Sequence, residues 1–209
     1  MSRLLVVTAV DAEADAVGTH DGVDVLVGGV GPAASAAATA AALAGGGYGL
    51  VLSVGIAGGF APLQPGDLAA ASAVVFADLG AETEDGFTAI GELGFAEHAR
   101  YSVDPRLATR LAAATGARQG TILTVATVTG TAVTASALAA RYPRAVAEAM
   151  EGFGVAEAAM RFGVPFGELR AISNLVGPRD RGAWRIPEAL AALRGALPGA
   201  VLAAAESMS

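Results

Sequence analysis

Short apolar runs alternate with alanine-rich segments along the whole chain. The apolar runs are rich in Val, Leu and Ile, and they predict strands at residues 3–9, 23–29, 50–55, 67–77, 121–126 and 166–173. The alanine-rich segments predict helices at residues 32–44, 104–115, 132–140, 145–162 and 187–206. Apolar strands that alternate with helices are typical of an α/β domain whose sheet is largely buried. We therefore expect one α/β domain over residues 1–209.

Residues 78–100 break this alternation. The segment is acidic, is interrupted by glycines and carries scattered Phe residues. It is compatible with a long loop or with a pair of irregular strands. A loop of this length in a compact domain often serves as a lid or as an interface, and the sequence leaves both roles open.

The composition excludes several classes of function. The chain has no Cys, and all 13 of its basic residues are Arg, so thiolate, Schiff-base and Walker-type phosphate-loop chemistry are excluded. A net charge of −7 argues against nucleic-acid binding. We expect His20 and His98 to be ordinary surface residues. Carboxylates, amides, arginines and backbone groups remain for chemistry, and we expect neither a metal nor a cofactor.

The hydropathy pattern favours a cytoplasmic protein. The longer apolar stretches are interrupted by Gly, Pro or charge, and none of them approaches the roughly 20 residues that span a bilayer. The amino end, MSRLLVVTAVDAEAD, has a short apolar run that acidic residues follow at once. This pattern predicts a first buried strand and not a signal peptide.

Two glycine-rich turns follow predicted strands. Residues 28–34, GGVGPAA, imitate a dinucleotide fingerprint, but the next strand ends without the acidic residue that holds a ribose, and Pro32 occupies the turn. We therefore do not expect a nicotinamide cofactor there. Residues 53–60, SVGIAGGF, form the second turn. Its glycines allow either close approach of the backbone to a ligand or tight packing of the strand on the loop.

Acidic residues occur in two segments that bear on function. Asp11, Glu13 and Asp15 follow the first predicted strand, where they serve either an active site or the start of a helix. In the predicted helix 145–162, Gly152 and Gly154 follow the Met-Glu pair at positions 150 and 151. Each glycine costs a helix about 1 kcal/mol relative to Ala. Either something approaches the helix closely there, or the helix is loosely packed.

Taken together and in order, these motifs resemble the nucleoside phosphorylase/nucleosidase superfamily. The resemblance rests on an acid after the first strand, GIAGG at 55–59, AMEG at 149–152 and RAISN at 170–174. Within the superfamily the chain is similar to methylthioadenosine/S-adenosylhomocysteine nucleosidases and more so to futalosine hydrolases. The resemblance covers nearly the whole chain. It implies a three-layer domain with a central twisted mixed sheet flanked by helices, assembled as a homodimer or a larger homo-oligomer.

The resemblance also assigns site residues. Glu13 matches the acid that activates the attacking water, and Glu151 matches the residue that binds the ribose hydroxyls. Asn174 stands where adenine-specific relatives carry an Asp that protonates the base. Phe153 is a candidate for stacking on the base. The residues expected to contact substrate, in addition to Glu13 and Asn174, are Ala57, Gly58, Met150, Glu151, Phe153 and Ser173.

The Asn at position 174 changes the expected base. A 6-oxopurine presents an acceptor at O6, and an amide can donate to O6 through its NH₂ while its carbonyl accepts from a protonated N7. The resemblance and this amide together predict hydrolysis of futalosine to hypoxanthine and dehypoxanthine futalosine. The alternatives are a 6-oxopurine nucleoside phosphorylase, a methylthioadenosine/S-adenosylhomocysteine-type nucleosidase, and a nucleoside-binding module without catalysis.

Two further segments bear on this choice. The first loop, TAVDAEAD, is acidic and lacks Arg, which favours neutral water over phosphate as the nucleophile. The segment GPRDRGAWR, residues 177–185, brings Arg179, Arg181 and Arg185 close to Trp184. Its arginines form either a solvated loop or a binding site for the carboxyphenyl chain of futalosine, in which an Arg binds the carboxylate and the indole stacks on the ring.

Overall fold

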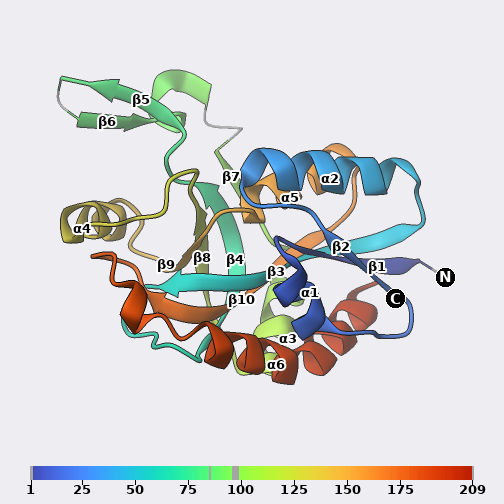
Figure 1. Ribbon diagram of the computed structural model, residues 1–209. Coiled ribbons are helices and arrows are strands. Elements are labelled where there is room, and N and C mark those ends of the chain that lie inside the picture. The colour runs from blue at the N-terminus through green and yellow to red at the C-terminus, as the bar shows by residue number, and fades with distance from the viewer. Residues whose placement is uncertain (1, 85, 96–98, 209) are drawn as a thin grey trace.

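The chain folds into three layers, in which helices cover both faces of a central mixed sheet (Figure 1). The computed structural model describes residues 2–84, 86–95 and 99–208. His98 lies outside the described residues. The layers and the mixed sheet confirm the predicted fold class.

The large sheet has eight strands, and its core is apolar on both faces. Seven strands lie in the order β10-β4-β8-β9-β3-β1-β2, and β7 pairs with β4. The apolar runs explain this burial, because residues 4–7 of β1 and residues 50–54 of β3 are all buried. The strands are β1 (Arg3–Thr8), β2 (Val23–Val27), β3 (Tyr48–Gly59), β4 (Leu68–Phe76), β7 (Arg100–Ser102), β8 (Arg118–Thr124), β9 (Ala145–Ala149) and β10 (Phe166–Leu175).

Strand β3 organises the sheet. Along one edge it pairs in parallel with β10. Along the other edge it pairs in parallel with β1 and then, at Gly58 and Gly59, antiparallel with β9. Since β10 also pairs with β4, the strands β3, β10, β4, β8 and β9 close into a ring. Because β1 and β10 both run parallel to β3, the carboxyl ends of these three strands lie at the same end of the sheet.

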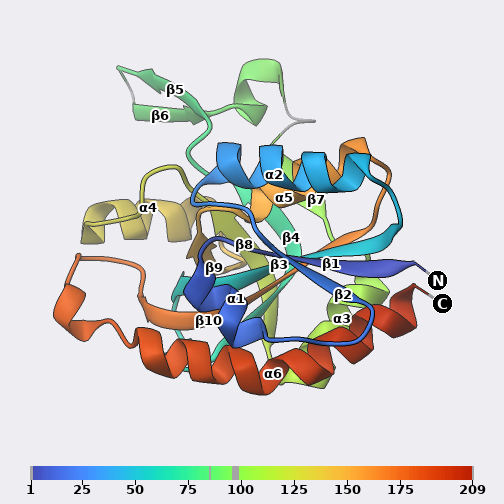
Figure 2. The same cartoon turned by 45° about the vertical axis from the view of Figure 1, so that its right-hand side comes forward.

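The helices form the two outer layers. Helices α2 (Pro32–Ala44) and α5 (Gly152–Arg161) cover one face, and α1 (Asp11–Val17), α3 (Pro105–Thr115) and α6 (Ile186–Ser207) cover the other (Figures 1 and 2). Helix α4 (Ala132–Arg141) lies beside the body. Helix α3 begins as its sequence predicts, because the Asp104 side chain accepts from the N–H groups of Arg106 and Leu107.

Helix α6 corrects one expectation. Together with the short helix η3 (Arg181–Ala183) it is long and apolar enough to span a bilayer, which the sequence pattern did not indicate. One face of α6 is buried through Ala189, Leu193 and Leu197, and the helix packs on α3, α1 and β10. Helix α6 is therefore part of the outer layer of the fold, with one face packed on the body.

A further element prediction was wrong. Residues 145–162, predicted as one helix, divide into β9 and α5. Ala and Glu favour helix, but residues 145–149 lie between β8 and β3, where pairing on both edges overrides this weak propensity. Helix α1 begins at Asp11, so the start of a helix, one of the two roles left open for Asp11, Glu13 and Asp15, is confirmed, and Glu13 of its first turn also lines the cavity described below.

For residues 78–100 the sequence left open a long loop or a pair of strands, and the structure shows a pair of strands. Strands β5 (Gly80–Thr83) and β6 (Gly86–Ala89) form a separate antiparallel hairpin, and the single turn η1 (Gly91–Phe95) follows them. The hairpin projects from the body beside α4 (Figures 1 and 2). The Arg141 guanidinium of α4 lies 4.6 Å from the centre of the Phe87 ring, which ties the hairpin to that helix.

Candidate active site

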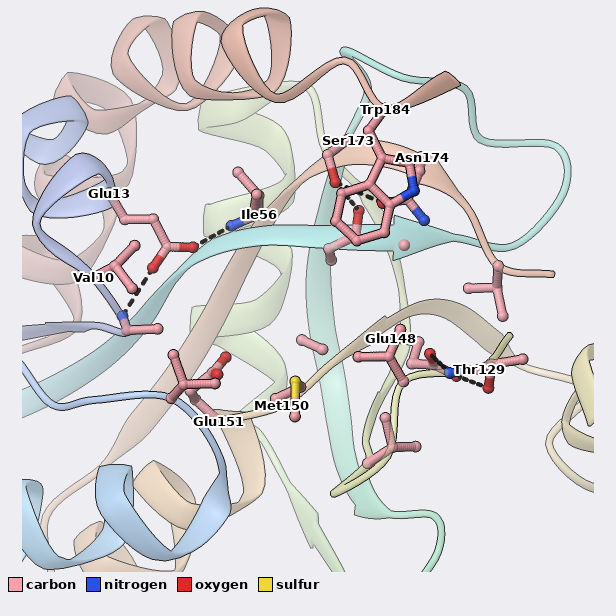
Figure 3. Close-up of a pocket in the computed structure, with 18 residues that line it drawn as sticks. Val10, Glu13, Ile56, Thr129, Glu148, Met150, Glu151, Ser173, Asn174 and Trp184 are labelled. Atoms are coloured by element: carbon pink, nitrogen blue, oxygen red, sulfur yellow. Dashed lines mark hydrogen bonds between the residues drawn. The ribbon is translucent and has the colours of Figure 1, made fainter. Parts of the chain in front are cut away.

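A cavity of about 310 Å³ lies at the end of the sheet where β1, β3 and β10 finish (Figure 3). Its volume is at the lower end of the range for small-molecule sites, which is about 300–1,000 Å³. Both open and closed α/β sheets bind their ligands at the carboxyl ends of parallel strands, so the place of the cavity in the fold is that of a binding site. Among the described residues of segment 78–100, none lines this cavity.

Glu13 stands in the first turn of α1, directly after β1, and lines the cavity. Its Oε2 accepts from the backbone N–H of Ala9 at 2.8 Å, and its Oε1 accepts from that of Ile56 at 2.9 Å. The side chain is only 4 % exposed. Two backbone bonds thus hold the carboxylate in place, and its remaining lone pairs can accept from a water or a hydroxyl.

Glu151 lies opposite Glu13, at the start of α5 (Figure 3). Its Oε1 accepts from the N–H of Gly31 at 3.2 Å, and its Oε2 accepts from Nη1 of Arg170 at 3.2 Å. Gly31 precedes α2, so the glycine turn of residues 28–34 directs its N–H at a carboxylate of the chain itself.

Arg170 is buried behind the two carboxylates, with 1 % exposure. It donates through Nε to Glu168 at 2.8 Å and through Nη2 to Ser53 at 2.9 Å, besides its bond to Glu151. A Cβ on Gly55 would come within 2.5 Å of the Glu13 carboxylate and 2.7 Å of Arg170 Nη1. Glycine at position 55 therefore lets the guanidinium and the carboxylate of Glu13 converge.

Three carboxyl groups thus surround one guanidinium. The nearby acids Glu168, Glu151 and Glu13 raise the pKa of Arg170 against the opposing effect of its burial. Glu168 has no exposed surface, and its Oε2 has no hydrogen-bond partner. Burial raises the pKa of Glu168, although its bond to Arg170 acts in the opposite direction. Burial of Glu168 thus favours its protonated form.

Ser173 and Asn174 both line the cavity, although consecutive strand residues normally point to opposite faces. The pairing of β10 with β3 shifts between Ile172 and Asn174. Such a bulge redirects side chains. Ser173 Oγ donates to Asn174 Oδ1 at 2.8 Å, and Asn174 Nδ2 donates to the carbonyl of Leu175 at 3.0 Å. Each polar atom of the amide keeps further capacity for a ligand.

The segment 177–185 contributes one cavity residue, Trp184. The Arg179 guanidinium carbon lies 5.7 Å from the centre of the indole ring, within cation–π range. Arg185 and Glu188 form an exposed ion pair at 3.8 Å. The N–H of Arg185 donates to the carbonyl of Ser173 at 2.7 Å, so the segment folds back over the end of β10. The indole and Asn174 therefore lie side by side at the cavity (Figure 3).

The structure gathers most of the predicted site residues around this cavity. Three of them lie elsewhere. The Phe153 ring is in the core, stacked on Tyr101 at 5.2 Å between ring centres, so stacking of Phe153 on a base is excluded in this arrangement. Arg179 and Arg181 are exposed and do not line the cavity. The predicted residues that line it are Glu13, Ala57, Gly58, Met150, Glu151, Ser173, Asn174 and Trp184.

Sequence reasoning gave no role to three polar residues at the site. Arg170 stood inside the quoted RAISN motif, and a charged residue within a buried strand was the available signal. Glu148 and Thr129 line the cavity at the end nearest Gly58. Glu148 was missed because residues 145–149 were assigned to a helix, which hid the strand geometry that turns its side chain to the cavity.

Comparison with known proteins identifies the family of the chain. The family model of the phosphorylase superfamily matches residues 16–204. The futalosine hydrolase of Streptomyces coelicolor is 55 % identical over 93 % of this chain and 93 % of its own length. The futalosine hydrolase of Acidothermus cellulolyticus is 50 % identical over 93 % of this chain and 88 % of its own length.

A solved structure has the same fold. The native structure of futalosine hydrolase from Helicobacter pylori strain 26695 superimposes with a TM-score of 0.81 at 19 % identity, covering 96 % of this chain and 97 % of that chain. At this identity the likeness concerns the fold alone. The family model and the two close relatives carry the assignment: the chain belongs to the phosphorylase superfamily and, within it, to the futalosine hydrolase family.

Proposed function

We propose that this chain hydrolyses the N-glycosidic bond of futalosine and releases hypoxanthine and dehypoxanthine futalosine. The observation that carries the proposal is the high identity, over nearly the full length, to two futalosine hydrolases. The cavity supports it, because a fixed carboxylate, Glu13, and an amide, Asn174, line the same space. This reaction belongs to the futalosine route to menaquinone.

Glu13 is proposed to activate the water that attacks C1′ of the ribose. The C1′–N9 bond breaks through an oxocarbenium-like sugar, the water oxygen bonds to C1′, and the proton of the water passes to the Glu13 carboxylate. Glu151 and Met150 are proposed to hold the ribose, the carboxylate through its hydroxyls and the thioether by packing. Buried Arg170 bonds Glu151 and lies beside Glu13, and so supports both carboxylates.

Asn174 is proposed to bind the departing base. Its NH₂ retains one N–H for the base O6, since the other donates to the Leu175 carbonyl. Its Oδ1 retains a lone pair for a protonated N7 while it accepts from Ser173 Oγ. The departing base takes a proton at N7 from solvent, which removes the negative charge that would otherwise develop on the base as the C1′–N9 bond breaks. The resulting N7–H donates to Oδ1 of Asn174, and Glu13 returns the proton of the attacking water to solvent.

The carboxyphenyl chain of futalosine is proposed to lie against Trp184. The indole is a cavity wall and Arg179 lies over it, so an aromatic ring stacked there meets a guanidinium at the rim. A guanidinium binds a carboxylate through two parallel hydrogen bonds. Arg181, on the exposed helix η3, is the second candidate for that carboxylate.

Water, and not phosphate, is the proposed nucleophile. The acidic residues that line the cavity are Glu13, Glu148 and Glu151, and its lining includes no basic residue among those described. The one buried guanidinium near them, Arg170, is already bonded to Glu151 and Glu168. Phosphate in this space would meet uncompensated negative charge.

The family resemblance further supports a homo-oligomer that acts in the cytoplasm on a small nucleoside. Size-exclusion chromatography with light scattering measures the oligomeric state directly. A mass equal to one chain of 20.5 kDa at micromolar concentration contradicts the proposed assembly.

The test of the function is a comparison of nucleosides. The purified protein is incubated with futalosine, inosine and methylthioadenosine, each with and without phosphate, and free base is measured. We expect hypoxanthine from futalosine as the fastest reaction, without a phosphate requirement. Faster release of adenine from methylthioadenosine, or an absolute need for phosphate, rejects the proposal.

A further inference from the structure

A buried carboxyl group at the far end of the cavity has no part in the proposed chemistry. Glu148 lies on β9 with 5 % exposure and lines the cavity. In the sheet, Gly58 of β3 is paired with Glu148 on one edge and with Asn174 on the other. The carboxyl of Glu148 and the amide of Asn174 therefore stand on the two sides of one glycine, and Figure 3 shows them on opposite walls of the cavity.

Thr129 holds the Glu148 carboxylate in one orientation. The backbone N–H of Thr129 donates to Oε1 at 2.9 Å, and its hydroxyl donates to Oε2 at 2.5 Å. An ionised carboxylate is an acceptor only, and each oxygen keeps a further lone pair. The donors of Thr129 are thus already bonded, so with Glu148 ionised the Glu148–Thr129 pair offers a ligand acceptors and not donors.

6-Oxopurines and 6-aminopurines differ in the hydrogen-bonding groups at N1 and at position 6. A 6-oxopurine carries a donor, N1–H, next to the acceptor O6, whereas a 6-aminopurine carries an acceptor at N1 next to a donor. A carboxylate beside N1 and an amide NH₂ beside O6 complement the first pattern. With a 6-aminopurine the carboxylate would face the lone pair of N1, and a buried acceptor left without a donor is costly.

We propose that Glu148 accepts the N1–H hydrogen bond of the 6-oxopurine base and, together with Asn174, sets the specificity of the site for that base. The inference rests on the proposed function, because it places the base between Asn174 and Glu148. A hydrogen bond to an ionised acceptor is stronger than a neutral one, so this contact discriminates more than a carbonyl in the same place. Burial raises the pKa of Glu148, and the two bonds from Thr129 oppose this by favouring the ionised form.

The first arm of the test uses the unaltered protein and free bases. Hypoxanthine, 1-methylhypoxanthine and adenine are titrated by calorimetry. We expect 1-methylhypoxanthine and adenine to bind at least about tenfold more weakly than hypoxanthine, since each lacks the N1–H. Equal binding of hypoxanthine and 1-methylhypoxanthine overturns the proposal. This arm does not require turnover of futalosine, so failure of the proposed reaction is seen separately.

The second arm separates the hydrogen bond from the size of the methyl group. Glu148→Gln keeps the shape but replaces the anionic acceptor by an amide. We expect its preference for hypoxanthine over adenine, measured as the ratio of dissociation constants, to fall at least about tenfold. Glu206→Gln, which removes an exposed carboxylate at the end of α6, is the control and should leave the ratio unchanged.

An unchanged ratio in a folded Glu148→Gln protein also overturns the proposal. Should Glu148→Gln fail to fold, the variant Thr129→Val takes its place, because it removes the hydroxyl that orients Oε2 while keeping the carboxylate. We expect Thr129→Val to lower the same ratio by a smaller factor. No change in this ratio, with equal binding of the methylated base, rejects a role for Glu148.

Discussion

At the scale of single residues, the site depends on carboxylates with different surroundings. Glu13 accepts two backbone N–H bonds, whereas Glu151 accepts one N–H and one guanidinium bond. Glu168 has an oxygen without any partner. All three residues are Glu, so their different surroundings distinguish their proposed roles. Glu13 is the proposed base, Glu151 holds the ribose, and Glu168 supports the Arg170 guanidinium.

Glu13→Gln should inactivate the protein without abolishing ligand binding. Either amide orientation places an NH₂ against the N–H of Ala9 or of Ile56, and the amide has no basic oxygen for a water proton. We expect the turnover number to fall about 10²–10⁴-fold. Hypoxanthine affinity, measured by calorimetry, should change far less.

The matched control for this change is Asp15→Asn, an exposed acid on the same helix. It should retain the activity of the parent. Unchanged turnover in Glu13→Gln removes Glu13 from the chemistry, and an equal loss in Asp15→Asn points to the net charge of α1 instead.

At the scale of elements, the segment after β10 shows what a sequence pattern can and cannot reveal. Its arginines were visible in the sequence, but which of them approaches the cavity depends on how the segment folds back over β10. The structure distinguishes Arg179, which lies over Trp184, from Arg181 on the exposed helix η3.

Arg179→Ala should raise the KM for futalosine more than the KM for inosine, which lacks the carboxyphenyl chain. A charge-assisted hydrogen bond contributes about 1.5–3 kcal/mol, so we expect an increase of about 10- to 100-fold for futalosine. Steady-state kinetics on both nucleosides measure it. Arg181→Ala is the comparison, and a larger effect there than in Arg179→Ala reverses the assignment of the two arginines.

The contact between α2 and α5 explains a glycine that the sequence had singled out. Gly154 lies in the first turn of α5, and a Cβ there would come within 2.2 Å of the Pro32 carbonyl and 2.5 Å of Ser35 Oγ. Of the two explanations for the glycines after Met150 and Glu151, close approach of another segment therefore holds at Gly154. It is made by α2, which also presents Gly31 to Glu151.

Gly154→Ala should lower the free energy of unfolding by about 1–3 kcal/mol through overpacking. Gly195→Ala is the matched control, because Gly195 is also helical but its Cβ would meet nothing within 4 Å. That change should stabilise the protein by about 0.5–1 kcal/mol. Urea denaturation measures both, and a tolerated alanine at position 154 would show that α2 and α5 can separate without cost.

At the scale of the whole molecule, periodicity predicted the layers better than it predicted the details of the site. The buried strands and the long helices appeared at nearly their observed positions, because burial on one or both faces leaves a regular apolar pattern. The division at Ala149, the bulge at Ser173 and the inward position of Phe153 could not be predicted, since each depends on pairing or packing between segments far apart in the chain.

The buried cluster around Arg170 links the site to overall stability. The pKa of Glu168 is raised by burial, so at pH values between its ordinary pKa and the higher folded value the folded protein holds a proton that the unfolded chain releases. This contribution to stability is fully present below the ordinary pKa of about 4.5 and is lost as the pH rises through the higher folded value.

Glu168→Gln removes this titration. We expect the stability of the variant relative to the parent to increase as the pH rises from 4.5 towards neutrality, as measured by urea denaturation at several pH values. Glu206→Gln, at an exposed position, should show a flat difference over the same range. A Glu168→Gln difference that is equally flat contradicts the raised pKa.

The central claim is that Asn174 hydrogen-bonds to the O6 edge of a base that is released by hydrolysis. A comparison of kcat/KM in phosphate-free buffer tests this claim most directly. The substrates are futalosine and the same nucleoside with a 6-amino group, and the proteins are the parent and Asn174→Asp. Mismatch in a hydrogen-bonded site reduces kcat/KM by about 10⁴–10⁵. We predict that the parent strongly prefers futalosine and that Asn174→Asp shifts the preference towards the 6-amino nucleoside. Equal preference in the two proteins, or a parent that cleaves the 6-amino nucleoside faster, would contradict the account.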